Sequence, residues 1–345
     1  MKTTRLAIVG LGNVGRRLLE LIEQKHTLLR KRFDAELVVV GAIDTTGGAV
    51  ATDKHGLDRA EILRLKRGKN RKGIATYAKL GKPGMTPQEM VEAVEADILV
   101  ELSLTNLKDG EPGLSTIRAA LTRKMSVVTA NKGPLVLAFQ ELTALAREQN
   151  VHLFYSATVT GGLPTLNIGT RDLGATVIDR FEGILNGTTN YILSRMSEGQ
   201  NYADALKHAQ EIGMAEADPT LDVDGWDAAN KLVIVANAVL HRPTVLKDLS
   251  VTGIREVTPE NLEEADEHRQ VIKLIAQAEK IGKDYRLSVA PTRLDKTHPL
   301  ASVGAGMMGV IYHTDINGTI FATIEEGDPY PTAAAVLRDI MQAAS

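Results

Sequence analysis

The chain has 345 residues, a length typical of a protein with two domains. Its 43% hydrophobic and 24% charged residues indicate a folded globular protein and exclude a mainly disordered one. The net charge of −3 and the 4% content of aromatic residues speak against a nucleic-acid partner, and the lack of cysteine excludes disulfides, iron–sulfur clusters and thiol nucleophiles.

The N-terminal residues have no pattern typical of a targeting signal. After Met1, the polar residues 2–5 lead directly into an apolar stretch that is too short for the core of a signal peptide. The sequence also has no run of about 18 apolar residues, the length that a membrane-spanning helix needs. We therefore expect a cytoplasmic protein with no membrane partner.

Strand and helix patterns alternate in the first part of the chain. Apolar residues 6–9 predict a buried parallel strand, which the turn Gly10-Leu11-Gly12-Asn13-Val14-Gly15 and a helical pattern follow. Further strands are predicted at 37–43, 98–102 and 126–128, with helices at about 112–123 and 134–149 after the last two. This alternation predicts an α/β fold in which residues 1–150 form a doubly wound parallel sheet.

The pattern changes after Val151 and predicts a second domain of the α+β class over residues 151–330. The segment 176–185 is typical of a strand, and Val271, Leu274, Ile275 and Ala278 would share one face of a helix. Other helices are predicted at about 187–197, 201–212 and 226–240, short strands within 286–324, and a final helix at 332–341. We expect residues 331–345 to return to the first domain and complete it.

The glycine-rich turn predicts a dinucleotide site. Gly10 permits a tight turn, Gly12 lets the backbone approach a pyrophosphate, and Gly15 lets the helix pack on the strand. Asn13 and Val14 begin the helix, whose free N–H groups attract phosphate. The alternative is a glycine turn that binds no ligand.

Asp44 ends the second strand and is the candidate for contacting the cofactor's ribose. It lies 29 residues after Gly15, whereas the usual spacing is about 20. A carboxylate here favours NAD, but Lys54 or the basic residues within 64–72 would accept the additional phosphate of NADP. That basic run can also be a solvated helix end and loop. The sequence leaves NAD and NADP as alternatives.

Lys132 follows Thr129-Ala130-Asn131, just beyond a predicted parallel strand. Open α/β sheets bind their ligands at this edge, so Lys132 is placed to contact cofactor or substrate. The alternative is an ordinary surface lysine at the start of a helix.

Asp227 and Lys231 lie four residues apart on one predicted helix and therefore face the same way. A pair of this kind is usually a surface ion pair, but residues 232–239 are apolar nearly all round and predict a buried helix. Burial lowers the pKa of a lysine and prepares it to exchange a proton near neutral pH, while the aspartate orients it. Hydride transfer to or from a carbonyl carbon requires such a proton transfer.

The sequence resembles the homoserine dehydrogenase family over nearly its whole length and in the family's order of motifs. The motifs are Gly-Leu-Gly-Asn-Val-Gly at 10–15, Val-Val-Thr-Ala-Asn-Lys at 127–132, Ala-Thr-Val-x-Gly-Gly-Leu-Pro at 157–164, Gly-Ile-Leu-Asn-Gly-Thr-Thr-Asn-Tyr-Ile-Leu at 183–193, and Glu-x-Asp-Pro…Asp-Gly-x-Asp-Ala-x-x-Lys at 216–231. The resemblance implies NAD- or NADP-dependent interconversion of L-homoserine and L-aspartate 4-semialdehyde, with substrate binding and homodimerisation in the second domain.

The resemblance also implies roles for individual residues. Lys231 corresponds to the lysine that transfers the proton, Asp227 to the acid beside it, and Lys132 to the lysine at the nicotinamide and substrate. Glu216 corresponds to the carboxylate that binds the substrate's amino group, and Asp222 to a further acid on the substrate side. The dense carboxylates fit a zwitterionic substrate, because a desolvated ammonium group needs a charge partner.

Two positions differ from the family's pattern. The family implies a sodium or potassium ion bound by a glutamate and by backbone carbonyls, which would be those of Val159, Gly161 and Leu163. This chain has Ser156 in place of the glutamate, which weakens the case for a bound cation. The loop before the last helix, which is glycine-rich in the family, is acidic here, and only Gly327 is assigned to the cofactor.

Two other functions remain open from the residues alone. One is a nicotinamide-dependent dehydrogenase of another small amino acid or amino-aldehyde, and the other is a dinucleotide sensor without catalysis. The eight histidines have no metal-ligand spacing, so we expect hydride transfer without zinc. Longer relatives carry a regulatory domain beyond the last helix, so we expect an enzyme without threonine control.

Overall fold

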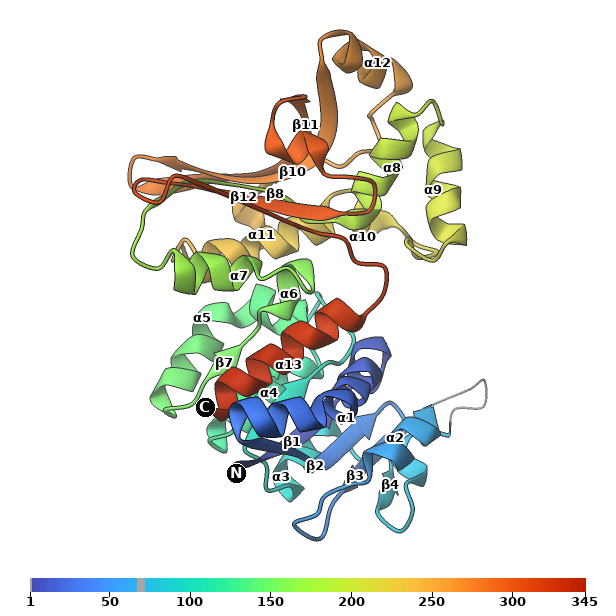
Figure 1. Cartoon of the computed structure of the whole chain (residues 1–345), viewed down its shortest axis with the longest axis vertical. Coiled ribbons are helices and arrows are strands. Elements are labelled where there is room, and N and C mark those ends of the chain that lie inside the picture. The colour runs from blue at the N-terminus through green and yellow to red at the C-terminus, as the bar shows by residue number, and fades with distance from the viewer. Residues whose placement is uncertain (1, 67–71) are drawn as a thin grey trace. The chain divides into compact units, whose positions relative to one another are not determined.

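The computed structural model in Figure 1 describes residues 2–66 and 72–345. The chain divides into two compact units, one formed by Met1–Gly162 with Asp328–Ser345 and the other by Leu163–Gly327. None of the helices in the described ranges combines the length and the apolarity that crossing a membrane requires.

The first unit is built on a largely parallel sheet. In the described residues its strands follow the order β4-β3-β2-β1-β5-β6-β7. They are β1 (Lys2–Val9), β2 (Ala35–Asp44), β3 (Gly47–Val50), β4 (Gly81–Pro83), β5 (Ile98–Glu101), β6 (Ser126–Thr129) and β7 (Leu153–Phe154). All but the antiparallel β3 and β4 run parallel. The chain order reverses between β1 and β5, and open sheets of this kind bind ligands at the carboxyl ends of the strands beside that reversal.

Helices cover both faces of this sheet. They are α1 (Asn13–Phe33), α2 (Arg59–Lys66), α3 (Pro87–Ala93), α4 (Gly113–Thr122), α5 (Lys132–Glu148), α6 (Ala157–Thr160) and α13 (Tyr330–Ala344), with a short turn η1 (Ile74–Thr76). Leu6 and Ile8 of β1 pack into a core with α1, α2 and α13, whereas Ala7 and Val9 face the core formed with α3, α4 and α5. The last helix, α13, lies beside α1 (Figure 1).

The second unit is built on a mostly antiparallel sheet with the strand order β13-β12-β8-β10-β11-β9 in the described residues. These strands are β8 (Ile178–Ile184), β9 (Ser250–Val251), β10 (Gln270–Ile281), β11 (Asp284–Asp295), β12 (Met308–Thr314) and β13 (Thr319–Ile324). Its helices are α7 (Thr165–Asn167), the π-helix η2 (Ile168–Asp172), α8 (Gly187–Ser197), α9 (Tyr202–Glu211), α10 (Thr220–Val223), α11 (Trp226–Ala238), η3 (Leu246–Asp248), α12 (Pro259–Glu267) and η4 (Pro299–Ser302). The helix α11 is buried from Ala228 to Ala238 and packs against β10 and β11, so Lys231 belongs to a core helix.

One predicted element is wrong. Residues 271–278, expected to form a helix, belong to the strand β10. Both faces of this strand are covered: Ile275 packs in a cluster with Leu300 and Val303, and α11 packs against the strand. A strand buried on both faces is apolar without alternation, which makes its sequence resemble that of a buried helix. The predicted α/β class with a parallel sheet and a second sheet domain is confirmed.

Candidate active site

The turn between β1 and α1 has the backbone geometry of a dinucleotide cradle. Gly10 has φ +92°, and a Cβ there would lie 2.3 Å from the Leu102 carbonyl oxygen. A Cβ on Gly15 would lie 2.2 Å from the Gly10 carbonyl oxygen, whereas a Cβ on Gly12 would meet no atom within 4 Å. Gly10 and Gly15 are therefore required by packing, and Gly12 leaves space against the backbone. Asn13 and Val14 begin α1, so this space lies at the N-terminus of a long helix.

Asp44 ends β2, as its position in the sequence predicts, but protein groups already surround its carboxylate. Lys66 Nζ lies 2.6 Å from Oδ2, and the backbone N–H groups of Thr46 and Ile74 donate at 2.8 and 3.1 Å. The Thr46 hydroxyl donates to Oδ1 at 2.6 Å. Burial would raise the pKa of Asp44, but these donors together lower it. Of the basic run, residues 67–71 lie outside the described residues.

Lys132 is the first residue of α5 and is partly buried at the carboxyl edge of the sheet. The turn before it is fixed by Asn131, whose Oδ1 accepts a hydrogen bond from Gly133 N at 3.0 Å and caps the helix. This places Lys132 on the same edge of the sheet as the glycine turn and Asp44.

In the second unit, Asn186 connects two aspartates of the acidic segment. Its Nδ2 donates to Asp222 Oδ1 at 2.7 Å and to Asp227 Oδ2 at 2.9 Å. Its Oδ1 accepts from Thr189 N at 2.8 Å, so the backbone at the start of α8 fixes which end of the amide faces the carboxylates. Asn186 was not assigned a role from the sequence, although it lies within the motif at 183–193.

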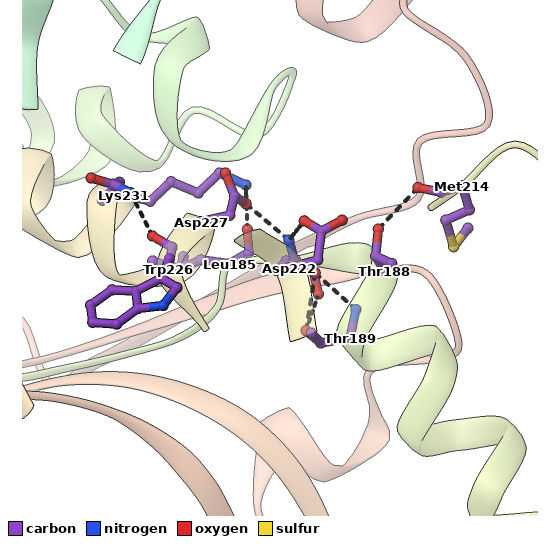
Figure 2. Close-up of polar contacts among 10 residues, drawn as sticks. Leu185, Thr188, Thr189, Met214, Asp222, Trp226, Asp227 and Lys231 are labelled. Atoms are coloured by element: carbon purple, nitrogen blue, oxygen red, sulfur yellow. Dashed lines mark hydrogen bonds and ion pairs between the residues drawn. The ribbon is translucent and has the colours of Figure 1, made fainter. Parts of the chain in front are cut away.

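Lys231 points its ammonium group into this cluster (Figure 2). Nζ lies 2.7 Å from Asp227 Oδ2 and donates to the Leu185 carbonyl oxygen at 2.6 Å. The side chains of Lys231 and Asp227 are only 11% and 15% exposed. Gly225, with φ +82°, makes the left-handed turn that joins α10 to α11 and thereby brings Asp222 and Asp227 to one Asn186 amide.

The other predicted site residues lie elsewhere in the fold. Glu216 is exposed on the segment between α9 and α10, where its backbone carbonyl accepts from Gln210. Gly327 precedes α13, and a Cβ on it would meet no atom within 4 Å. Val159 lies on α6, Gly161 ends that helix with φ +55°, and Leu163 is buried just beyond it.

Ser156, at the position where the family has a cation-binding glutamate, is already engaged within the first unit. Its hydroxyl donates to Asp339 Oδ1 at 2.7 Å, and its N–H donates to Asp339 Oδ2 at 2.9 Å. The same hydroxyl accepts from the Arg338 guanidinium at 3.0 Å. A metal ion bonded to this oxygen would meet the positive charge of Arg338. The Ser156 hydroxyl therefore does not fit the role of a cation ligand.

Comparisons with known proteins agree across both units. The family model for homoserine dehydrogenase matches residues 164–341, and the model for the homoserine dehydrogenase NAD-binding domain matches residues 10–156. A homoserine dehydrogenase of Methanocaldococcus jannaschii is 36% identical over 97% of both chains. The NAD(+)-dependent homoserine dehydrogenase of Pseudomonas canavaninivorans is 38% identical over 99% of this chain and 96% of its own. The structure of a hyperthermophilic archaeal homoserine dehydrogenase in complex with NADPH has a TM-score of 0.84 at 29% identity and covers 99% of this chain and 98% of its own.

Proposed function

The chain belongs to the homoserine dehydrogenase family and is an NAD(P)-dependent oxidoreductase, and from this premise we propose that Lys231 moves the proton of the reaction. The enzyme interconverts L-homoserine and L-aspartate 4-semialdehyde in amino-acid biosynthesis. Family membership decides against the two alternatives that the residues alone left open, an enzyme for a different substrate and a sensor without catalysis.

The observation that carries this proposal is the geometry at Lys231 Nζ. An ammonium group has three hydrogens, and the Asp227 carboxylate and the Leu185 carbonyl orient two of them. We assign the third to the substrate oxygen. In the reductive direction, Lys231 donates its proton to the oxygen on C4 as that oxygen gains negative charge. In the oxidative direction, the neutral amine accepts the proton of the homoserine hydroxyl.

We assign the cofactor to the first unit. The space beside Gly12 and the N-terminus of α1 fit a pyrophosphate, with Gly10, Asn13, Val14 and Gly15 completing the turn. When bound, the nicotinamide ring supplies or accepts the hydride at C4 of the substrate. Lys132 would contact substrate and cofactor at the sheet edge. Asp44 would act on the ribose through Thr46 and Lys66, which bond to its carboxylate. Gly327 would contact the cofactor with its backbone.

We assign the substrate's amino group to the acidic segment of the second unit. Glu216 and Asp222 provide the negative charge that an ammonium group needs when it leaves water. Asp222 uses Oδ1 to accept from Asn186, which orients the carboxylate. Val159, Gly161 and Leu163 could offer only backbone carbonyls to a cation, and we propose a reaction that needs neither sodium nor potassium.

We propose that the protein forms a homodimer through the sheet of the second unit. The strand β13 lies at the edge of this sheet, and its Phe321 is 40% exposed. Exposed edge strands with apolar side chains favour association with a second chain. We also propose a cytoplasmic location, where the nicotinamide cofactors and amino-acid substrates are available.

The direct test of the proposed roles is a pair of measurements on one variant. Lys231→Ala should lose homoserine-dependent reduction of NAD or NADP while it retains dinucleotide binding. Turnover close to that of the unmodified enzyme would refute the role of Lys231, and loss of dinucleotide binding would refute the division of roles between the two units.

A further inference from the structure

Glu101 is a buried carboxylate that the proposed reaction does not use. It is the last residue of β5, is 0% exposed, and lies at the edge of the sheet where the cofactor is assigned. Carboxylates are almost never fully buried without a partner, because removing the charge from water is costly. A glutamate at this position therefore needs an explanation.

The Glu101 carboxylate accepts hydrogen bonds from two segments that end this edge of the sheet. Ser103 N donates to Oε1 at 2.9 Å, and the Thr129 hydroxyl lies 3.3 Å from Oε2. The Asn131 side chain also donates to the carboxylate. Burial raises the pKa of Glu101, and the hydrogen bonds from Ser103, Asn131 and Thr129 oppose that rise.

Asn131 transmits this contact to the start of α5. Its Nδ2 faces Glu101 and the Ser103 hydroxyl, the latter at 3.2 Å, so its Oδ1 must face the other way. There it caps the helix by accepting from Gly133 N, the residue directly after Lys132. A second bond, from Asn131 N to the Thr129 hydroxyl at 3.0 Å, holds the backbone of the same turn.

Two glycines allow the close packing around this contact. A Cβ on Gly113 would lie 2.7 Å from Asn131 Nδ2 and 3.3 Å from Glu101 Oε2. A Cβ on Gly133 would lie 2.4 Å from the Asn106 carbonyl oxygen. Asn131 is itself only 1% exposed. The hydrogen bonds at its two ends hold the Asn131 amide in one orientation within this packing.

We propose that Glu101 is a positioning residue, which fixes the Asn131 amide and through it the first turn of α5, so that Lys132 is held ready for its ligands. The inference rests on the proposed role of Lys132. Glu101 is 0% exposed and so offers no surface to substrate or cofactor, and it acts through the turn 129–131. Small displacements of a ligand-contacting group can cost about 100-fold in rate, which is the scale on which such a residue acts.

Exchanging the two partners tests the contact itself. Glu101→Gln leaves an amide facing the Asn131 amide, and Asn131→Asp leaves a carboxylate facing the Glu101 carboxylate, although it keeps an oxygen to cap Gly133. Each change should lower kcat by about 10-fold to 100-fold without changing the Kd for the dinucleotide more than about 3-fold. The double variant restores one amide and one carboxylate, and we expect it to recover kcat to within about 3-fold of the unmodified enzyme. A double variant that is folded but as slow as the single variants would overturn the proposal.

A double-mutant cycle of Glu101 with Lys132 distinguishes this proposal from the proposed role of Lys132 itself. If Glu101 acts through Lys132, Glu101→Gln should have no further effect on kcat in a Lys132→Ala background. Multiplicative losses would overturn the positioning role and leave the role of Lys132 intact. Full activity of Lys132→Ala would instead refute the proposed role of Lys132.

Asp97→Asn provides the matched control. Asp97 lies just before β5, at the opposite end of the same strand, and pairs with Arg5 at 2.9 Å. Its loss should lower the Tm and leave kcat and KM unchanged. If Asp97→Asn lowered kcat as much as Glu101→Gln, the effect of both changes would be on the strand as a whole, and the proposal would fail.

Discussion

Asn186 Nδ2 donates a hydrogen bond to Asp227 Oδ2 at 2.9 Å, although the two residues are 41 positions apart in the sequence. The same carboxylate oxygen lies 2.7 Å from Lys231 Nζ. The Asn186 amide and the Lys231 ammonium group therefore both bond to one oxygen of Asp227. Together they fix the orientation of this carboxylate in the first turn of α11. This fixes the direction from which Lys231 presents its proton.

Asn186→Ala should lower kcat by about 10-fold to 100-fold, because Asp222 and Asp227 both lose the donor that orients them. Asn186→Asp should be slower still, since it places a third carboxylate against two others. Steady-state rates with homoserine and either nicotinamide cofactor measure both effects.

The control for this change is Asn201→Ala. Asn201 caps α9 in the same way as Asn186 caps α8, with Oδ1 accepting from Asp204 N at 2.9 Å. Its Nδ2 also bonds to Asp204, which is not a predicted site residue. Losing this cap should cost about 1 kcal/mol of unfolding free energy and leave kcat unchanged. Equal losses of kcat in the two variants would mean that the effect of Asn186 comes from helix capping alone.

Lys231→Ala should lower kcat by at least about 100-fold, because no proton reaches or leaves the substrate oxygen. The affinity for the dinucleotide should change little, since the glycine turn belongs to the other unit. Stopped-flow fluorescence with cofactor alone and steady-state rates with homoserine provide the two readings. Lys207→Ala, which removes an exposed lysine of an i, i+4 pair with Glu211, should leave both unchanged.

The site illustrates which contacts a sequence can predict. Asp227 and Lys231 are neighbours on one helix, so their spacing predicts the ion pair that the structure contains. The contacts of Asn186 depend on how a strand end, α10 and α11 meet, and no local pattern in the sequence encodes that meeting. Glu101 was missed for a related reason: it ends an apolar strand, where a polar residue is expected to face solvent.

The same limit explains one wrong prediction and one contact that the sequence does not predict. Periodicity assigns 271–278 to a helix because a strand covered on both faces has no alternation to distinguish it. The position of Asp44 at the end of β2 follows from the sequence, but its ion pair with Lys66 does not. That pair forms because α2 brings Lys66 back to the strand end across 22 residues.

The Asp44–Lys66 pair predicts a specific dependence of stability on pH. The donors around Asp44 lower its pKa in the folded chain below the ordinary value of 3.8. Its contribution to the unfolding free energy is therefore present above pH 3.8 and is lost as the pH falls through the lower pKa of the folded chain. Asp44→Asn should cost about 2–3 kcal/mol at pH 7 and progressively less below pH 4.

Urea unfolding of Asp44→Asn and the unmodified protein at a series of pH values measures this difference. The control is Asp179→Asn, because Asp179 is exposed and lies 3.9 Å from Lys280, so its loss should cost less than about 0.5 kcal/mol at any pH. A cost for Asp44→Asn that stayed constant down to pH 3 would contradict the ion pair.

The contacts of Ser156 predict that activity does not depend on the monovalent cation. The Ser156 hydroxyl is bonded to Asp339 and Arg338, and the guanidinium opposes a second positive charge beside it. Initial rates and Tm in sodium or potassium chloride should match those in choline chloride at equal ionic strength to within about twofold in rate. Saturable activation by either ion at millimolar concentration would contradict this expectation, and equal ionic strength excludes a general screening effect.

Gly12 provides the clearest separation between binding and stability at the cofactor site. A Cβ on Gly12 would meet no protein atom within 4 Å, so Gly12→Ala should fold with an unchanged Tm. The added methyl group would occupy the space assigned to the pyrophosphate, and the Kd for NAD and NADP should rise by at least about 10-fold. Gly15→Ala is the opposite case, because its Cβ would lie 2.2 Å from the Gly10 carbonyl oxygen, and it should lower the Tm as well as the affinity. Isothermal titration with each dinucleotide, together with thermal unfolding, separates the two variants. If Gly12→Ala bound the cofactor as tightly as the unmodified enzyme, the pyrophosphate would not lie against this turn, and the assignment of the cofactor to the end of β1 would be wrong.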